Sequence, residues 1–270
     1  MAEFSKQGTA LSKAFVSISI DADANSPSAD GSPPSSPQVQ TTKSVVAELV
    51  ALSSQIRIAA TWAFCNPTAT ESMQQVAGSP VGYELALLFD PTLAKAEFSR
   101  SDIMQTVVRP LQSAADAGIA ISTLAVPHGW QPKHVDLLTK YGVTIIRTPH
   151  VFSSQTTTGL RAVCHGLWQV PVSASLQNGR WMANLGQWRT MRRAIDGAVQ
   201  QKGWCHLRID AGSIARGDVA SGLRTVGRML QYVHQLRTSG HIAVETLRDA
   251  AVRLAPKRNI TSAHSILHAA

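Results

Sequence analysis

The chain has 270 residues, of which 44% are hydrophobic, and a formal net charge of +8. This length and composition suit a globular protein with a sizeable core. No apolar run reaches the roughly 18 residues that a membrane-spanning helix needs, and residues 1–6 lack the charged-then-apolar layout of a secretory signal. The sequence therefore predicts a cytoplasmic protein without a membrane span.

Cysteine usage argues against a disulfide framework and against a zinc ribbon. The three cysteines, Cys65, Cys164 and Cys205, are far apart and form no CxxC pair. We interpret them as small buried thiols in a reducing compartment.

The basic charge balance suggests an anionic partner, namely a nucleic acid, a membrane surface or an acidic polymer. The basic residues are dispersed, however, and the densest group, Arg189, Arg192 and Arg193, falls on one face of a predicted helix. No aromatic residues for base stacking alternate with this group. Nucleic acid is therefore not the expected partner, and a solvated helix face is the simpler interpretation.

The first element expected in the chain is a strand at residues 15–20, which runs into Asp21 and Asp23. Residues 1–11 form an N-terminal tail before it. Residues 24–40 are rich in Pro, Ser and Gly and almost without large apolar side chains. They predict a disordered loop inserted after the first strand, because such a composition cannot bury enough apolar surface to order itself.

Strands and helices alternate along the rest of the chain. Apolar runs predict the strands, and amphipathic segments, several of them followed by Gly, predict the helices. The expected strands are residues 56–64, 83–89, 121–126, 143–147, 167–173 and 205–209, and the expected helices are residues 41–52, 70–77, 101–117, 132–141, 185–202 and 219–239, followed by an extended piece and a helix within residues 241–255. Pro171 lies inside one of these strands, which is therefore expected to be irregular or at an edge.

About seven strand–helix units of this kind indicate an α/β fold with a parallel sheet covered by helices. We expect one closed or nearly closed barrel domain over residues 12–255, followed by a C-terminal tail at residues 256–270. Neither GxGxxG nor GxxxxGK[ST] occurs, so the sequence predicts neither a dinucleotide site nor a P-loop.

Four segments follow one another in the order and spacing of a known family. Residues 83–86 (YELA) stand where a His-Glu-Ile-x-x-His opening would be, and residues 140–149 contain a Tyr-Gly pair and then an arginine near a proline. Residues 205–211 (CHLRIDA) are similar to a divergent His-Leu-Trp-x-His-Pro strand, and residues 222–247 to a closing helix with a Thr-Leu turn. In these segments the chain resembles the NodB-homology polysaccharide deacetylases, whose fold is a distorted (β/α)7 barrel.

The resemblance implies removal of acetyl groups from amino sugars. In that family one Asp and two His hold a divalent metal, a second Asp acts as base, and a late His protonates the leaving amine. Here the two metal-His positions hold Leu88 and Thr92, and the late-His position holds Asp210. Asp21 and Asp23 would supply the base and the metal ligand. Because leucine cannot bind a cation, the resemblance implies a site that has lost most of its metal ligands.

Acidic residues at predicted strand ends are the candidate catalytic and metal-binding groups. Asp21, Asp23 and Asp210 are the catalytic candidates, and Asp23 and Asp90 are the candidate ligands of a divalent metal, if one is bound. Asp21 and Asp23 would point to the same face of a continuing strand, and all four carboxylates at one barrel mouth would suit magnesium, calcium or manganese. The alternative interpretation is structural, with turn acids at solvated strand ends and Asp90 as a helix cap.

Arg147, His128, Trp130 and Trp168 are the candidate substrate-binding residues. A guanidinium at the strand end of Arg147 can clamp a carboxylate or orient an Asp. Sugars stack on indole faces, so the two tryptophans are candidates for a saccharide groove, with packing at the barrel rim as the alternative. His128 follows a predicted strand end, where it is either a ligand or acid–base group or a polar loop residue.

Three functions remain open at this point. The first is a degenerate deacetylase-like protein that binds a saccharide or a partner in polysaccharide metabolism, with impaired or lost activity. The second is an active hydrolase of amide- or ester-bearing sugars that uses the strand-end Asp residues. The third is a basic scaffold for an anionic polymer. The absence of imidazoles at positions 88 and 92 favours the first.

Overall fold

The computed structural model describes eight stretches of the chain. They are residues 13–22, 35–68, 71–89, 99–126, 134–148, 160–163, 166–176 and 181–254. None of the helices in these stretches is long and apolar enough to cross a membrane.

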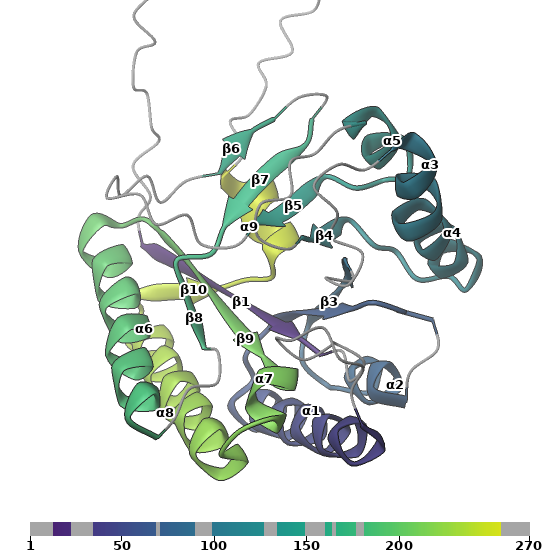
Figure 1. Cartoon of the computed structure of the whole chain (residues 1–270). Coiled ribbons are helices and arrows are strands. Elements are labelled where there is room, and N and C mark those ends of the chain that lie inside the picture. Colours follow the sequence, from purple (N-terminus) through teal and green to yellow (C-terminus); the bar gives the residue numbers. More distant parts are fainter. Residues whose placement is uncertain are drawn as a thin grey trace, which may run out of the picture.

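A single ten-stranded sheet forms the centre of the molecule (Figure 1). Its strands lie in the order β6-β7-β5-β4-β3-β2-β1-β9-β8, and β10 pairs with the first half of β1. Every pairing is parallel except that of β6 with β7. The strands are β1 (Ala14–Asp21), β2 (Ala60–Phe64), β3 (Tyr83–Leu88), β4 (Thr123–Ala125), β5 (Ile145–Thr148), β6 (Arg161–Ala162), β7 (Trp168–Pro171), β8 (Ala174–Leu176), β9 (Trp204–Asp210) and β10 (Ile242–Val244).

One bent segment serves both ends of the curled sheet. Its first half, β7, pairs with β5, and its second half, β8, pairs with β9. Between them, the Ser173 backbone N–H donates to the His206 carbonyl oxygen at 2.8 Å. The irregular strand expected around Pro171 is thus two short strands joined at a bend, because proline has no N–H to continue a ladder. The result is the distorted (β/α) barrel that the resemblance implies.

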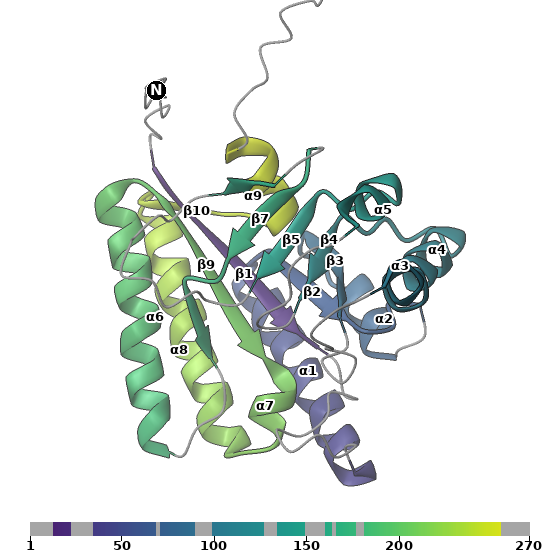
Figure 2. The same ribbon diagram turned by 45° about the horizontal axis from the view of Figure 1, so that its top comes forward.

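Helices surround the sheet (Figures 1 and 2). Those next to β1, β8 and β9 are α1, α6 and α8, whereas α3, α4 and α5 lie beside β3, β4 and β5. The helices are α1 (Ser36–Ile56), α2 (Glu71–Ala77), α3 (Arg100–Ile103), the π-helical η2 (Met104–Val108), α4 (Arg109–Asp116), α5 (Val135–Lys140), α6 (Trp181–Gln201), α7 (Ala211–Ala215), α8 (Val219–Thr238) and α9 (Leu247–Leu254).

The first helix begins earlier than expected. The sequence predicts a disordered loop through residue 40, yet α1 starts at Ser36. Pro37 occupies the first turn, where its missing N–H costs nothing, and the Gln38 side-chain oxygen accepts from the Ser35 backbone N–H at 2.9 Å. The Pro- and Ser-rich composition therefore contains a helix start at its end, and the part at residues 24–34 lies outside the described residues.

Residues alternate between the two faces of β1, and this alternation divides the interior. Val16, Ile18 and Ile20 belong to the main apolar core under the helices. Ser17, Ser19 and Asp21 take the opposite, concave face, although all are buried. The barrel interior is therefore partly polar, and its polar groups need partners inside the barrel.

Helix α9 closes the end of the barrel where the strands begin. Leu247 and Ala250 pack with Phe15, Ile145 and Trp204, which lie at the starts of their strands.

Two buried side chains of the sheet accept hydrogen bonds from the first backbone N–H groups of α9. The Leu247 N–H donates to the Thr61 hydroxyl oxygen and the Arg248 N–H donates to Glu84, each at 2.9 Å. The open end of the interior, where a site can lie, is consequently the opposite one, at the carboxyl ends of the strands.

Candidate functional site

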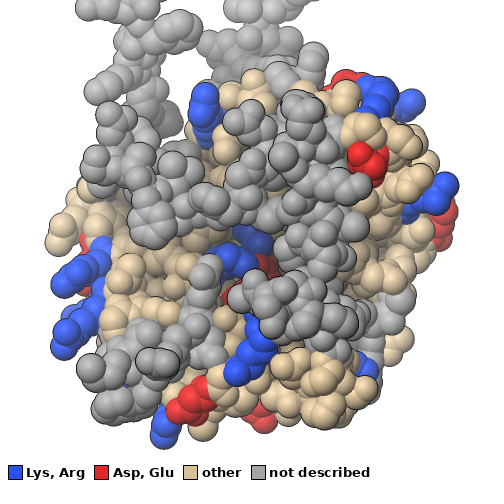
Figure 3. All heavy atoms as spheres, in the orientation of Figure 1, with Lys and Arg blue, Asp and Glu red and all other residues tan. Residues whose placement is uncertain are grey.

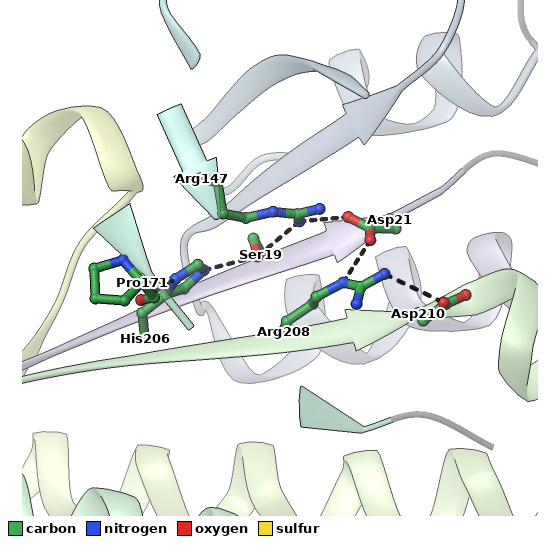
Figure 4. A network of polar contacts seen from close by, with 7 residues as sticks. All are labelled: Ser19, Asp21, Arg147, Pro171, His206, Arg208 and Asp210. Atoms are coloured by element: carbon green, nitrogen blue, oxygen red, sulfur yellow. Dashed lines mark hydrogen bonds and ion pairs between the residues drawn. The ribbon is translucent and has the colours of Figure 1, made fainter. Parts of the chain in front are cut away.

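Asp21 lies at the centre of a buried charge network (Figure 4). It is the last residue of β1. One carboxylate oxygen pairs with Nη1 of Arg147 from β5, and the other accepts from Nε of Arg208 from β9 at 2.7 Å. The exposed fractions of the Asp21 and Arg147 side chains are only 5% and 3%. Both carboxylate oxygens are therefore already paired with cations inside the barrel.

The pKa of the Asp21 carboxyl reflects this pairing. Burial alone would raise the pKa, but the charges of Arg147 and Arg208 outweigh burial and lower the pKa to about 2. Burial lowers the pKa of Arg147, whereas Asp21 raises that of Arg208. Arginine remains protonated at any ordinary pH, so this part of the network consists of one carboxylate and two guanidinium ions.

A chain of hydrogen bonds through uncharged groups holds Arg147 in place. Its Nη1 also donates to the Ser19 hydroxyl oxygen at 3.1 Å, and Ser19 Oγ lies 2.8 Å from His206 Nε2. His206 Nδ1 lies 3.1 Å from the carbonyl oxygen of Pro171. Because that carbonyl only accepts, Nδ1 carries the ring proton, and Nε2 accepts from Ser19. Burial is the main cause that lowers the pKa of His206, to about 3, so the ring is neutral.

The Ser19–His206 pair has the geometry of an activated nucleophile, with a hydroxyl at hydrogen-bond distance from an imidazole that a third group orients. The exposed fraction of each of the two residues is 0%. No substrate reaches a hydroxyl that is enclosed in this way. We therefore assign Ser19 and His206 as positioning residues for Arg147 rather than as catalytic residues.

Asp210 lies beside Arg208 at the mouth of the barrel. It ends β9, and its register partner across the ladder is Asp21. Its Oδ2 is 3.4 Å from Arg208 Nη2, and its Oδ1 accepts from the Ser213 backbone N–H at 2.7 Å. Burial is the largest cause that raises its pKa. Asp210 therefore caps the short helix α7 and also belongs to the charge network.

Leu88 belongs to an apolar wall on the same concave face. It is buried together with Ala63, Ala86 and Ala125, and Cys65 packs against this group. Asp21 lies opposite Ala63, and Arg147 lies opposite Ala125, in the sheet register. The positions between the two charged residues around the curl are therefore small or apolar.

The described residues do not fit the metal that the resemblance implies. No group of three or more His, Cys, Asp or Glu side chains that could hold an ion occurs among them. More directly, a divalent cation at Asp21 would have to displace one guanidinium and sit beside another in a buried setting, where like charges repel strongly. Asp23, Asp90 and Thr92 lie outside the described residues.

The remaining predicted residues are partly placed. Trp168 begins β7 and pairs with Ile145, whereas the register partner of Arg147 is Val170. Trp168 is therefore two residues further from the carboxyl end of the sheet than the partner of Arg147. His128 and Trp130 lie outside the described residues. The structure brings Asp21, Arg147 and Asp210 into one network, and it adds Arg208, which sequence reasoning missed.

A signal for Arg208 does exist in the sequence. It stands between Leu207 and Ile209, which belong to the main core, and two residues before Asp210. A charged residue at that spacing in a buried strand must share the concave face with Asp210. It therefore needs a partner of opposite charge there.

Comparison with known proteins supports the fold alone. No family model matches the sequence, and no curated protein sequence matches it. Three solved structures share the fold at low sequence identity. A protein described as a polysaccharide deacetylase from Mycobacterium smegmatis has a TM-score of 0.64 at 13% identity, with 90% of each chain covered.

The other two structures are equally similar. One, from Pseudomonas aeruginosa PAO1 and also described as a polysaccharide deacetylase, has a TM-score of 0.64 at 10% identity, covering 88% of this chain and 89% of that chain. The Puue allantoinase has a TM-score of 0.63 at 11% identity, again covering 88% of this chain and 89% of that chain. The chain thus has the barrel fold of the polysaccharide deacetylases.

Proposed function

We propose that this chain is a protein of polysaccharide metabolism with a deacetylase fold, which binds a saccharide or a partner protein and has lost metal-dependent deacetylation. The observation that supports this most strongly is the pairing of Asp21. Each of its carboxylate oxygens faces a guanidinium group. A metal ion or a proton at Asp21 would compete with these guanidinium groups, and breaking a buried ion pair costs about 3–5 kcal/mol.

The surroundings of Asp21 support the same proposal. Leu88, at a position where the resemblance implies a metal ligand, is packed among alanines. Arg147 and Arg208 supply fixed positive charge where the family would use a metal ion. A fixed positive charge can still bind the oxygen atoms of a ligand.

Metal analysis combined with an activity assay tests the proposal. After equilibration with zinc and gel filtration, we expect far less than one zinc per chain and no acetate release from oligomers of N-acetylglucosamine. A chelator should leave the midpoint of thermal unfolding unchanged. Stoichiometric zinc together with acetate release, abolished by Asp23→Ala, would overturn the proposal.

A second candidate function rests on Asp210. Its carboxyl group is at the mouth, with 21% of the side chain exposed, and burial raises its pKa, while that of neighbouring Asp21 is lowered. Carboxyl groups whose pKa values are pushed apart are typical of an acid and a base in hydrolases. This candidate predicts hydrolysis of an ester- or amide-bearing sugar that falls about 100-fold or more in Asp210→Asn. Unchanged turnover in that variant would exclude it.

The basic scaffold remains a third candidate because of the outer helices. Arg189 and Arg193 of α6 and Arg224 and Arg228 of α8 are exposed, and basic atoms gather along the edge of the molecule over α6 (Figure 3). The logarithm of the binding constant for heparin would then fall steeply and linearly with the logarithm of the salt concentration. A flat salt dependence would exclude this candidate.

A further inference from the structure

Arg147 keeps unused hydrogen-bond donors although it is buried. Both hydrogens of Nη1 are directed to Ser19 and Asp21. Its Nε–H and the two N–H groups of Nη2 have no partner among the described residues, while only 3% of the side chain is exposed. None of these donor atoms is among the side-chain atoms of the described part of the chain that are both fully enclosed and without a partner, so the spare donors of Arg147 are not sealed in the core. They are available to an acceptor that enters the barrel mouth.

Arg208 also keeps unused donors. Nε is used by Asp21, and one N–H of Nη2 reaches Asp210 over a long 3.4 Å. Nη1 has no partner in the described part of the chain, and 21% of the side chain is exposed. The two guanidinium groups contact the Asp21 carboxylate from two sides (Figure 4). Both guanidinium groups therefore keep unused N–H groups, one on each side of the same carboxylate (Figure 4).

The local charge favours an anion. Arg147 and Arg208 face Asp21 and Asp210, and Arg216 also acts on Asp210 through its charge. Among the described ionisable groups, two guanidinium groups thus meet two carboxylates at the mouth, and the exposed Arg216 adds a third positive charge outside this network. A recess near the middle of the face in Figure 3 contains basic and acidic atoms side by side, so charged groups are accessible at the surface.

The other side of the mouth is apolar. Ala63, Ala86, Leu88 and Ala125 occupy the concave positions between Asp21 and Arg147. The three alanines are enclosed, whereas Leu88 is 9% exposed, so a ligand that enters here meets guanidinium groups on one side and Leu88 on the other. The carbon face of a sugar ring suits such a wall, while a charged substituent of the ring would reach the arginines.

We infer that Arg147 and Arg208 form a receptor for a ligand carboxylate, and that the saccharide bound by this chain is an acidic sugar of the uronate type. This inference rests on the proposed saccharide-binding function and deepens it. The planar guanidinium matches a carboxylate in two parallel hydrogen bonds. The single acceptor of a neutral acetamido group offers no charge to offset the desolvation of two guanidinium ions.

Calorimetric titration of the full chain with four probes tests the inference. The probes are D-glucuronate, acetate, glucose and N-acetylglucosamine. We expect glucuronate to bind about tenfold or more tightly than either neutral sugar, as one charge-assisted pair provides, and more tightly than acetate. Equal affinity for glucuronate and a neutral sugar would overturn the carboxylate receptor. Equal affinity for acetate and glucuronate would overturn the saccharide assignment.

Two variants link the affinity to the receptor. Arg208→Gln should lose about tenfold or more in glucuronate affinity, and Arg208→Lys, which keeps the charge without the planar fork, should lose less. Arg224→Gln removes the same charge from the exposed face of α8 and should bind like the wild type. Undiminished affinity in Arg208→Gln would contradict the inference, and the probe selectivity of the wild type tests it even if that variant does not fold.

The two proposals fail in different ways. Preference for N-acetylglucosamine over glucuronate, without stoichiometric zinc, would overturn the acidic-sugar inference and leave the proposed function standing. Stoichiometric zinc with acetate release would overturn the proposed function whatever the sugar preference.

Discussion

Arg147 and Asp21 form an ion pair across the inside of the curled sheet, although β4, β3 and β2 separate their strands in the sheet order. The pair therefore links two walls of the barrel rather than two neighbouring strands. Arg208 joins the same carboxylate from β9, on the other side of β1. Three strands are thus tied together at the level where the site opens.

Removal of Arg147 should destabilise the fold. Arg147→Met leaves the Asp21 carboxylate buried with only one cation, and we expect a loss of about 3 kcal/mol in the free energy of unfolding. The double variant Asp21→Leu/Arg147→Met should recover part of this loss, because no buried anion remains unpaired. Urea denaturation of the two single variants and the double variant measures the coupling, which should exceed about 1 kcal/mol. Additive effects would show that the pair does not hold the walls together.

His206 should make stability fall in mild acid. Its pKa is lowered from 6.5 to about 3 in the folded state, so the unfolded chain binds a proton that the folded chain refuses. The contribution of His206 to the free energy of unfolding is fully present above pH 6.5 and is lost as the pH falls toward 3. In total it amounts to up to about 5 kcal/mol.

The variant His206→Gln should flatten this dependence between pH 6.5 and 4. The control His241→Gln changes an exposed histidine and should keep the wild-type slope. The free energy of unfolding at several pH values decides between them. An identical slope in wild type and His206→Gln would show that His206 is not buried as a neutral ring.

Glu84 should have the opposite effect on pH dependence. It accepts from Thr61, Thr123 and the first turn of α9, and burial, the largest cause, raises its pKa above 4.5. Where the folded state keeps a proton that the unfolded state has lost, stability falls as the pH rises. Glu84→Gln cannot ionise, so its stability relative to wild type should increase with pH above about 4.5.

The control for this prediction is Glu48→Gln on the exposed face of α1, which should show no such trend. If Glu84→Gln is less stable than wild type by a constant amount at all pH values, the hydrogen bonds of Glu84 matter but its ionisation does not.

Helices α7 and α8 approach closely at Gly222. A Cβ atom there would lie 2.8 Å from Cγ2 of Ile214, which is buried. Gly222→Ala should therefore cost about 1–3 kcal/mol through overpacking. Gly227→Ala on the same helix meets nothing within 4 Å and should stabilise the protein by about 0.5–1 kcal/mol, since alanine favours a helix. Thermal unfolding of both variants, side by side, tests the contact, and equal midpoints would refute it.

Much of the fold follows from local pattern. The parallel strands and their covering helices show in the apolar runs and in the helical periodicity, because burial on one or two faces sets the hydrophobic period. The start of α1 at Ser36 and the short helix α7 do not show, since the first lies within a Pro- and Ser-rich composition and the second is only five residues long. The bend between β7 and β8 was anticipated only as an irregularity at Pro171.

By itself, the sequence determined which chemical groups are present: strand-end acids, arginines and a leucine where the resemblance implies a metal-binding histidine. It did not determine which of them meet. Arg147 and Asp21 are 126 residues apart in the chain, and only the curl of the sheet brings them into contact. A buried charge takes its role from its neighbours, because in a medium of low polarity an ion either finds a partner or does not stay ionised. The closure of the barrel therefore decided that Asp21 is a partner of arginine.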